Sequence, residues 1–102
     1  MDAAKKKRLK GAGWDTGSVA KFLELTPEES ALIEIKVRLT ELIKKARSRR
    51  NLSQLALAER LGSSQSRVAK IEAGDPSVSL DLLVRASFAS GATRKELARA
   101  IA

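Results

Sequence analysis

The stretch L-S-Q-L-A-L-A-E-R-L-G-S-S-Q-S-R-V-A-K-I-E-A-G, from Leu52 to Gly74, is typical of two short helices separated by a tight turn. Ser53 precedes the first helix, where its hydroxyl can accept a hydrogen bond from an otherwise unpaired backbone N–H. The first helix should end at Gly62, because glycine adopts a positive φ without the steric cost of a Cβ. Ser63 or Ser64 then caps the second helix. The pattern predicts two consecutive helices that meet at Gly62.

Each of these helices has one apolar face. Leu57, Ala58 and Leu61 share a face of the first helix, and Val68 and Ile71 lie three residues apart on the second. The other faces of the second helix carry donor-rich side chains, mostly at its N-terminal end: Gln65, Ser66, Arg67 and Lys70. A second helix with a polar leading edge is what a helix-turn-helix, here residues 53–73, presents to the major groove of DNA.

Composition restricts the class of protein. The 102 residues include neither Cys nor His, only 3% are aromatic, and Ala and Leu dominate, so we expect one all-α domain. Without Cys or His the chain lacks thiolate metal ligands and the usual nucleophile–base pairs, and we expect no enzyme activity, metal or cofactor. No apolar run is long enough for a membrane span and no signal peptide is recognisable, so a cytoplasmic protein without membrane contact is expected.

The positive charge is concentrated around the two helices. Twenty Lys and Arg against twelve Asp and Glu give a net charge of +8, and residues 36–70 hold ten basic and two acidic residues. This window carries the whole excess, which favours a nucleic-acid partner over a merely solvated basic face. RNA is the weaker choice, because the chain lacks the aromatic platform on which single-stranded bases stack.

The N-terminal residues 1–17 read as a flexible basic tail, because K-K-K-R-L-K is followed by G-A-G without periodicity. The tail either adds phosphate contacts or only improves solubility. The remaining residues, 18–102, should form the domain. Ser18 can cap a short helix from Val19 to about Glu24, and Trp14 is expected to pack on the domain.

A long helix is predicted from the T-P-E-E signal at residues 26–29 to about Arg50, with Thr26 as N-cap and Glu29 as its capping-box partner. Asn51 suits a left-handed residue that closes this helix. Two further residues, Ile33 and Val37, form a second apolar stripe that should face the 14–22 segment or a partner subunit. The main apolar stripe comprises Leu32, Ile35, Leu39, Leu42, Ile43 and Ala46.

Two more helices are predicted after the turn at residues 74–77. Ser77 or Ser79 caps the first, which reaches about Ser90 and ends at Gly91. Its expected buried residues are Leu80, Leu83, Val84, Ala86 and Phe88. A capping box from Thr93 to Glu96 starts the last helix. The apolar residues of this last helix, which either close the core or complete a dimer interface, are Leu97, Ala98 and Ile101.

Residues 39–101 resemble the phage-repressor-like (XRE) helix-turn-helix family, a five-helix DNA-binding domain. The resemblance rests on L-S-Q-x-x-L-A-x-x-L-G-x-S-Q-S-x-V-x-K-I-E-x-G from Leu52 to Gly74, in which Ala58 lets the helices approach and Gly62 makes the turn. The N-terminal segment, residues 1 to about 35, departs from the family and leaves the dimer geometry open.

Carried over by position, the resemblance implies roles for individual residues. Base edges would be contacted by Gln65, Ser66, Ala69 and Lys70, with Gln65 suited to adenine and Lys70 to guanine. Phosphates would be contacted by Gln54, Ser64, Arg67 and Arg49. Arg47 and Glu72 would form an internal salt bridge. Only two side chains of this face, Gln65 and Lys70, can discriminate strongly between bases; we call them readers. A homodimer on a near-palindromic double-stranded operator is therefore expected.

A looser resemblance concerns the partner. The S-x-D-x-L stretch from Ser79 to Leu83 and the ending A-T-R-K-E-L-A-R-A-I look like short HigA-like antitoxins, which bind a RelE/HigB-type toxin and repress their own operon. The leading hypothesis is therefore a dimeric repressor of antitoxin type. The alternatives are an XRE-type regulator without a toxin partner, and a protein-interaction module in which the helix pair is only a scaffold.

Overall fold

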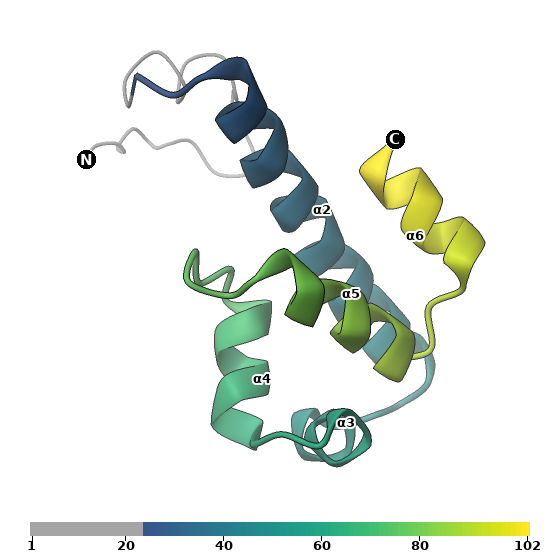
Figure 1. Cartoon of the computed structure of the whole chain (residues 1–102). Coiled ribbons are helices and arrows are strands. Elements are labelled where there is room, and N and C mark those ends of the chain that lie inside the picture. The colour runs from purple at the N-terminus through teal and green to yellow at the C-terminus, as the bar shows by residue number, and fades with distance from the viewer. Residues whose placement is uncertain (1–23) are drawn as a thin grey trace. The chain divides into compact units, whose positions relative to one another are not determined.

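The computed structural model describes residues 24–102, and in this range it contains five α-helices and no strand (Figure 1). They are α2 (Pro27–Arg49), α3 (Gln54–Leu61), α4 (Gln65–Glu72), α5 (Leu80–Ala89) and α6 (Arg94–Ile101). The all-α prediction is confirmed. Residues 35–102 make one compact unit, and the described residues before Ile35 belong to a separate one. The boundary expected after residue 17, the helix expected from Val19 and the packing of Trp14 lie outside the described residues.

A hydroxyl starts each helix of the described range. Thr26 and Glu29 form the predicted capping box, with the Thr26 N–H 2.8 Å from Glu29 Oε1 and the Glu29 N–H 3.1 Å from Thr26 Oγ1. The box of Thr93 and Glu96 is also present. The remaining N-caps are Ser53, Ser64 and Ser79. Of the alternatives left open by the sequence, Ser64 and Ser79 therefore cap the helices that follow them.

The turns after α2, α3 and α5 depend on left-handed residues. Gly62 ends α3 with φ 72°, and its N–H bonds back to carbonyls of α3. Asn51 closes α2 with φ 57°, as predicted. Gly91 follows α5 with φ 102°, and a Cβ there would collide with the Arg50 side chain. Arg50 in turn donates a 3.1 Å hydrogen bond to the Gly91 carbonyl, so the end of α2 fixes the turn between α5 and α6.

The core of the compact unit is aliphatic and comes from α2, α3, α4, α5 and the loop before α5. Its buried residues are Leu39, Ile43, Leu57, Ala58, Leu61, Val68, Ile71, Val78, Leu82, Leu83 and Ala86. On α2 the predicted stripe is buried at Leu39, Ile43 and Ala46, but Leu32 at the start of the helix is 42% exposed. Val37, on the second stripe, is 49% exposed.

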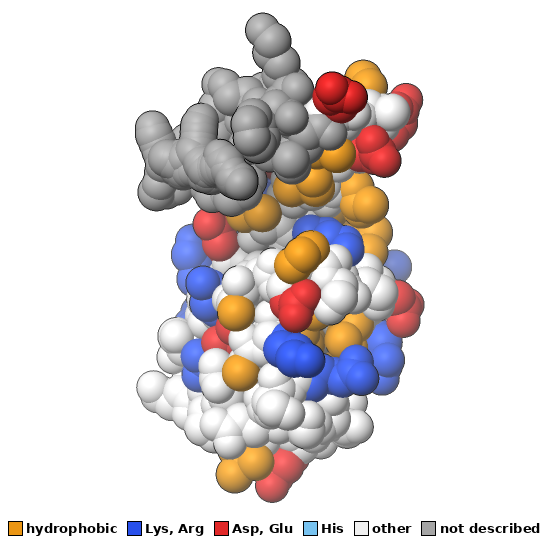
Figure 2. Space-filling view, turned by 90° about the vertical axis from the view of Figure 1, so that its left-hand side faces the viewer, with side chains coloured by type: hydrophobic (Ala, Val, Ile, Leu, Met, Phe, Trp, Pro, Cys, Tyr) orange, Lys and Arg blue, Asp and Glu red, His pale blue; other side chains and the backbone are white. Residues whose placement is uncertain are grey.

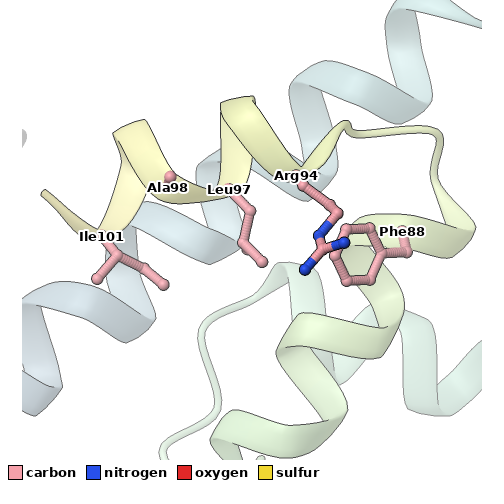
Figure 3. Close-up of a pocket in the computed structure, with 5 residues that line it drawn as sticks. All are labelled: Phe88, Arg94, Leu97, Ala98 and Ile101. Carbon is pink, nitrogen blue, oxygen red and sulfur yellow. The ribbon is translucent and has the colours of Figure 1, made fainter.

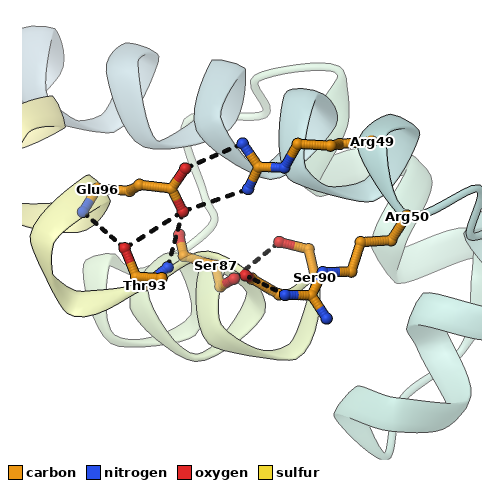
Figure 4. Close-up of polar contacts among 7 residues, drawn as sticks. Arg49, Arg50, Ser87, Ser90, Thr93 and Glu96 are labelled. Carbon is orange, nitrogen blue, oxygen red and sulfur yellow. Dashed lines mark hydrogen bonds and ion pairs between the residues drawn. The ribbon is translucent and has the colours of Figure 1, made fainter.

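The prediction that Phe88 is buried is wrong, because its side chain is 43% exposed. Two serines near the C-terminal end of α5 are buried instead. Ser87 and Ser90 are fully buried. The Ser87 hydroxyl donates a 2.8 Å hydrogen bond to the Leu83 carbonyl. The Ser90 hydroxyl donates a 2.8 Å bond to the Ser87 carbonyl (Figure 4). A serine hydroxyl that bonds within its own helix loses no partner on burial. Phe88 lies about 100° further round the helix and points outward.

Candidate nucleic-acid interface

The four residues expected to face base edges all lie on the solvent-exposed side of α4. Gln65, Ser66, Ala69 and Lys70 are exposed. The opposite side of α4 packs into the core through residues that are at most 1% exposed, Val68 and Ile71. Packing against the core therefore fixes the rotation of α4 about its axis and leaves this polar face accessible.

Hydroxyls organise the N-terminal end of α4. Ser64 Oγ accepts a 3.2 Å hydrogen bond from the Arg67 N–H and lies 3.1 Å from Ser66 Oγ. The Ser66 hydroxyl is therefore hydrogen-bonded to the capping hydroxyl at this end of the helix. The Arg67 side chain is exposed at the same end.

Arg47 joins the long helix to the helix pair. Its Nε and Nη2 donate to the two carboxylate oxygens of Glu72, at 2.6 Å and 3.0 Å, and its Nη1 donates to the Leu52 carbonyl at 2.8 Å. The Glu72 side chain is only 6% exposed and that of Arg47 21%. This is the bridge that the resemblance implied. It ties the C-terminal end of α4 to α2 and to the entrance of α3.

Two of the residues assigned to phosphates have partners within the protein. The Gln54 amide nitrogen donates to Glu72 Oε1 at 3.2 Å, which makes Gln54 part of the Arg47–Glu72 network. Arg49 pairs with Glu96 of α6 through bonds of 2.9 Å and 3.2 Å (Figure 4). Bonds from the Thr93 N–H and from Arg49 hold the pKa of Glu96 below its usual value. Arg49 is thus held towards α6 and not towards α4.

A hollow of about 460 Å³ lies between α4 and the start of α5. The α4 residues that line it are Ser64, Ser66, Arg67 and Lys70, and the residues from the other wall are Ser77, Val78, Ser79 and Leu82. Two cations and several hydroxyls therefore border one surface depression. The sequence predicts Ser77 and Ser79 only as possible helix caps, and no local pattern places them opposite Arg67 and Lys70.

Asp75 adds a negative charge near the hollow. Its Oδ1 accepts from the Ser77 N–H at 2.9 Å and from the Ser77 hydroxyl at 2.8 Å. These two bonds, with a smaller effect from the charge of Lys70, lower the pKa of the Asp75 carboxyl. Asp75 is therefore ionised at neutral pH and partly offsets the charge of Lys70, so Arg67 is the less compensated cation of the hollow.

Figure 2 shows the side on which α4 lies in Figure 1. The lower part of this face is mainly uncharged, with Lys and Arg side chains on both sides of it.

Among residues 24–102 no cluster of acidic side chains is suited to hold a metal ion. None of the helices in the same range is both long and apolar enough to cross a membrane.

Helix α6 lies on the far side of α5 from α4 (Figure 1), and a second surface feature lies beside it. It is a shallow groove of about 690 Å³ between the end of α5 and α6, lined by Phe88, Arg94, Leu97, Ala98 and Ile101 (Figure 3). Phe88 and Ile101 are 43% and 42% exposed. We refer to this surface as the α5–α6 groove.

Comparison with known families identifies the central segment. Residues 43–87 match the family model described as helix-turn-helix, which covers the end of α2, all of α3 and α4, and most of α5. No curated protein and no solved structure shows significant similarity to the chain.

Proposed function

Residues 43–87 belong to the XRE-type helix-turn-helix family of DNA-binding transcription regulators, and from this we propose that the protein is a dimeric repressor of a near-palindromic operator. The observation that carries the proposal is the exposed polar face of α4 on a helix whose other face is locked into the core. That geometry suits insertion of α4 into the major groove.

Within this proposal Gln65 and Lys70 read base edges, while Ser66 and Ala69 add a weak donor and a methyl contact. Arg67 and Ser64 contact phosphates beside the hollow, and Gln54 adds a contact at the start of α3. Arg49 is the fourth residue of this set, and its half-exposed side chain also pairs with Glu96.

The experiment that tests the function is selection of binding sites from a random duplex library, followed by titration of the selected site at several salt concentrations. We expect two half-sites about one helical turn apart. Affinity should fall steeply with salt, since each phosphate that a Lys or Arg neutralises adds about 0.9 to the slope of log K against log salt. Failure to enrich any sequence over random DNA would contradict the proposal and favour an interaction module.

The dimer is proposed to form through the α5–α6 groove. A repressor with two strong readers per copy needs a second copy to reach a specific site, and this groove brings two large exposed apolar side chains together on one surface. Residues of α6 are at most half-buried within one copy, although the helix is amphipathic. A second copy packed on the groove would cover them.

Replacing Phe88 by Ser, or Ile101 by Ser, should therefore shift the protein from dimer to monomer in sedimentation experiments and weaken operator binding at least tenfold. Leu55→Ser is the matched control, because Leu55 is 54% exposed on α3, outside the groove. A dimer that survives both groove substitutions but dissociates in the control would place the interface elsewhere.

The finer proposal is that the repressor is a cytoplasmic antitoxin with a RelE/HigB-type toxin as partner. It rests on the resemblance of the S-x-D-x-L stretch and of the last helix to HigA-like proteins. A small RelE-like reading frame beside this gene, whose product forms a complex with the purified protein, would support it. Without such a neighbour the simpler XRE-type regulator is favoured.

A further inference from the structure

Lys36 reaches from α2 to the loop between α4 and α5. Its ammonium donates a 2.8 Å hydrogen bond to the Val78 carbonyl and a 3.4 Å bond to the Pro76 carbonyl. The side chain is half-buried. Bonds from an ammonium to carbonyl oxygens are charge-assisted and stronger than neutral ones. The Lys36 ammonium is therefore bonded to backbone carbonyls of this loop.

The loop that Lys36 holds forms one wall of the hollow beside α4. Val78 is buried, and its N–H bonds to the Asp75 carbonyl within the loop. Ser77 and Ser79, on either side of Val78, line the hollow opposite Arg67 and Lys70. The position of this wall thus depends on a side chain about 40 residues earlier in the chain.

Helix α2 also contacts the C-terminal end of α4, which precedes this loop. Arg47, about three turns after Lys36 on α2, fixes the C-terminal end of α4 through Glu72. Two cationic side chains of α2 therefore hold the polar side of the molecule at two points. If the α4–α5 loop is already ordered in the free protein, DNA binding does not have to supply the free energy of ordering it.

We propose that Lys36 is a positioning residue for DNA binding, which sets the α4–α5 loop against a DNA strand without touching the DNA. The inference rests on the proposed operator binding. Lys36→Met keeps the apolar stem and removes the donor. We expect about a tenfold loss of operator affinity, because the loop must then be ordered on binding. Lys36→Arg, which keeps a cationic donor, should recover most of it.

The matched control is Lys45→Met, which removes the same charge from an exposed residue half a turn round the same helix. Two readouts separate positioning from direct contact. Positioning leaves the slope of log K against log salt unchanged in Lys36→Met, whereas loss of a direct phosphate contact lowers it by about 0.9. Amide hydrogen exchange at Ser77, Val78 and Ser79 in the free protein should accelerate in Lys36→Met and not in Lys45→Met.

Equal affinities of Lys36→Met and Lys45→Met for the selected operator would overturn the inference and leave the proposed function intact. A fall of the salt slope in Lys36→Met alone would also overturn it, since Lys36 would then contact a phosphate. If the unmodified protein fails to prefer any duplex, the proposed function itself fails, and this outcome is visible before any variant is compared.

Discussion

Arg47→Met is expected to lower the free energy of unfolding by about 3 kcal/mol or more, because it leaves a buried carboxylate without its cation. The Glu72 side chain is 6% exposed, so water cannot replace the lost guanidinium. Among the residues that the structure describes, only Gln54, at 3.2 Å, would still bond this carboxylate. Urea denaturation followed by circular dichroism measures the change.

Arg49→Met is the control for this substitution. It breaks the Arg49–Glu96 pair, in which the Arg49 side chain is 50% exposed, and exposed pairs contribute at most about 1 kcal/mol. The double variant Arg47→Met/Glu72→Leu should recover much of the stability, since it removes both charges together. Equal losses from Arg47→Met and Arg49→Met would show that the Arg47–Glu72 pair is solvated in solution.

Gln65→Ala is expected to reduce the preference for one base pair in each half-site by about 10- to 100-fold, or about 1–3 kcal/mol, with less effect on random DNA. The physical reason is that a glutamine amide bonds two groups of one adenine at once, which no methyl group replaces. Titration of a panel of operators, each with one base pair changed, measures the loss. The preference should disappear at one position and persist at the others.

Arg67→Ala is the matched comparison, because Arg67 lies two residues after Gln65 on the same helix but is assigned to a phosphate. This variant should weaken all duplexes by a similar factor and lower the salt slope by about 1. Lys70→Ala should behave like Gln65→Ala at a guanine position. If Gln65→Ala weakens every duplex equally, Gln65 binds the backbone and the assignment of readers is wrong.

The helix boundaries were predictable because they depend on residues three or four apart. The Thr26 and Thr93 capping boxes and the turn at Gly62 are local signals, and the structure has each where the sequence predicted it. The exposure of the polar face of α4 followed from the spacing of Val68 and Ile71. The contacts of that face with DNA remain a prediction.

The features that could not be predicted from the sequence depend on contacts between residues far apart in the chain. The pair between Arg49 and Glu96 joins residues 47 positions apart, and no local pattern indicates it. The contact of Arg49 with a phosphate stays a prediction. Lys36 was counted only as part of the basic window, although it holds the loop around Val78. Phe88 is predicted to be buried but is exposed, whereas Ser87, the residue before it, is buried with its hydroxyl bonded to the Leu83 carbonyl.

The hydroxyl caps described above also bear on how fast the domain forms. Every helix of the described range starts at a Ser or Thr whose oxygen bonds an N–H three residues ahead. Such contacts close very short loops, so their formation costs little chain entropy. Small helical domains with mainly local contacts refold within about microseconds to milliseconds. A chain that unfolds transiently is therefore expected to regain the exposed polar face of α4 within about milliseconds.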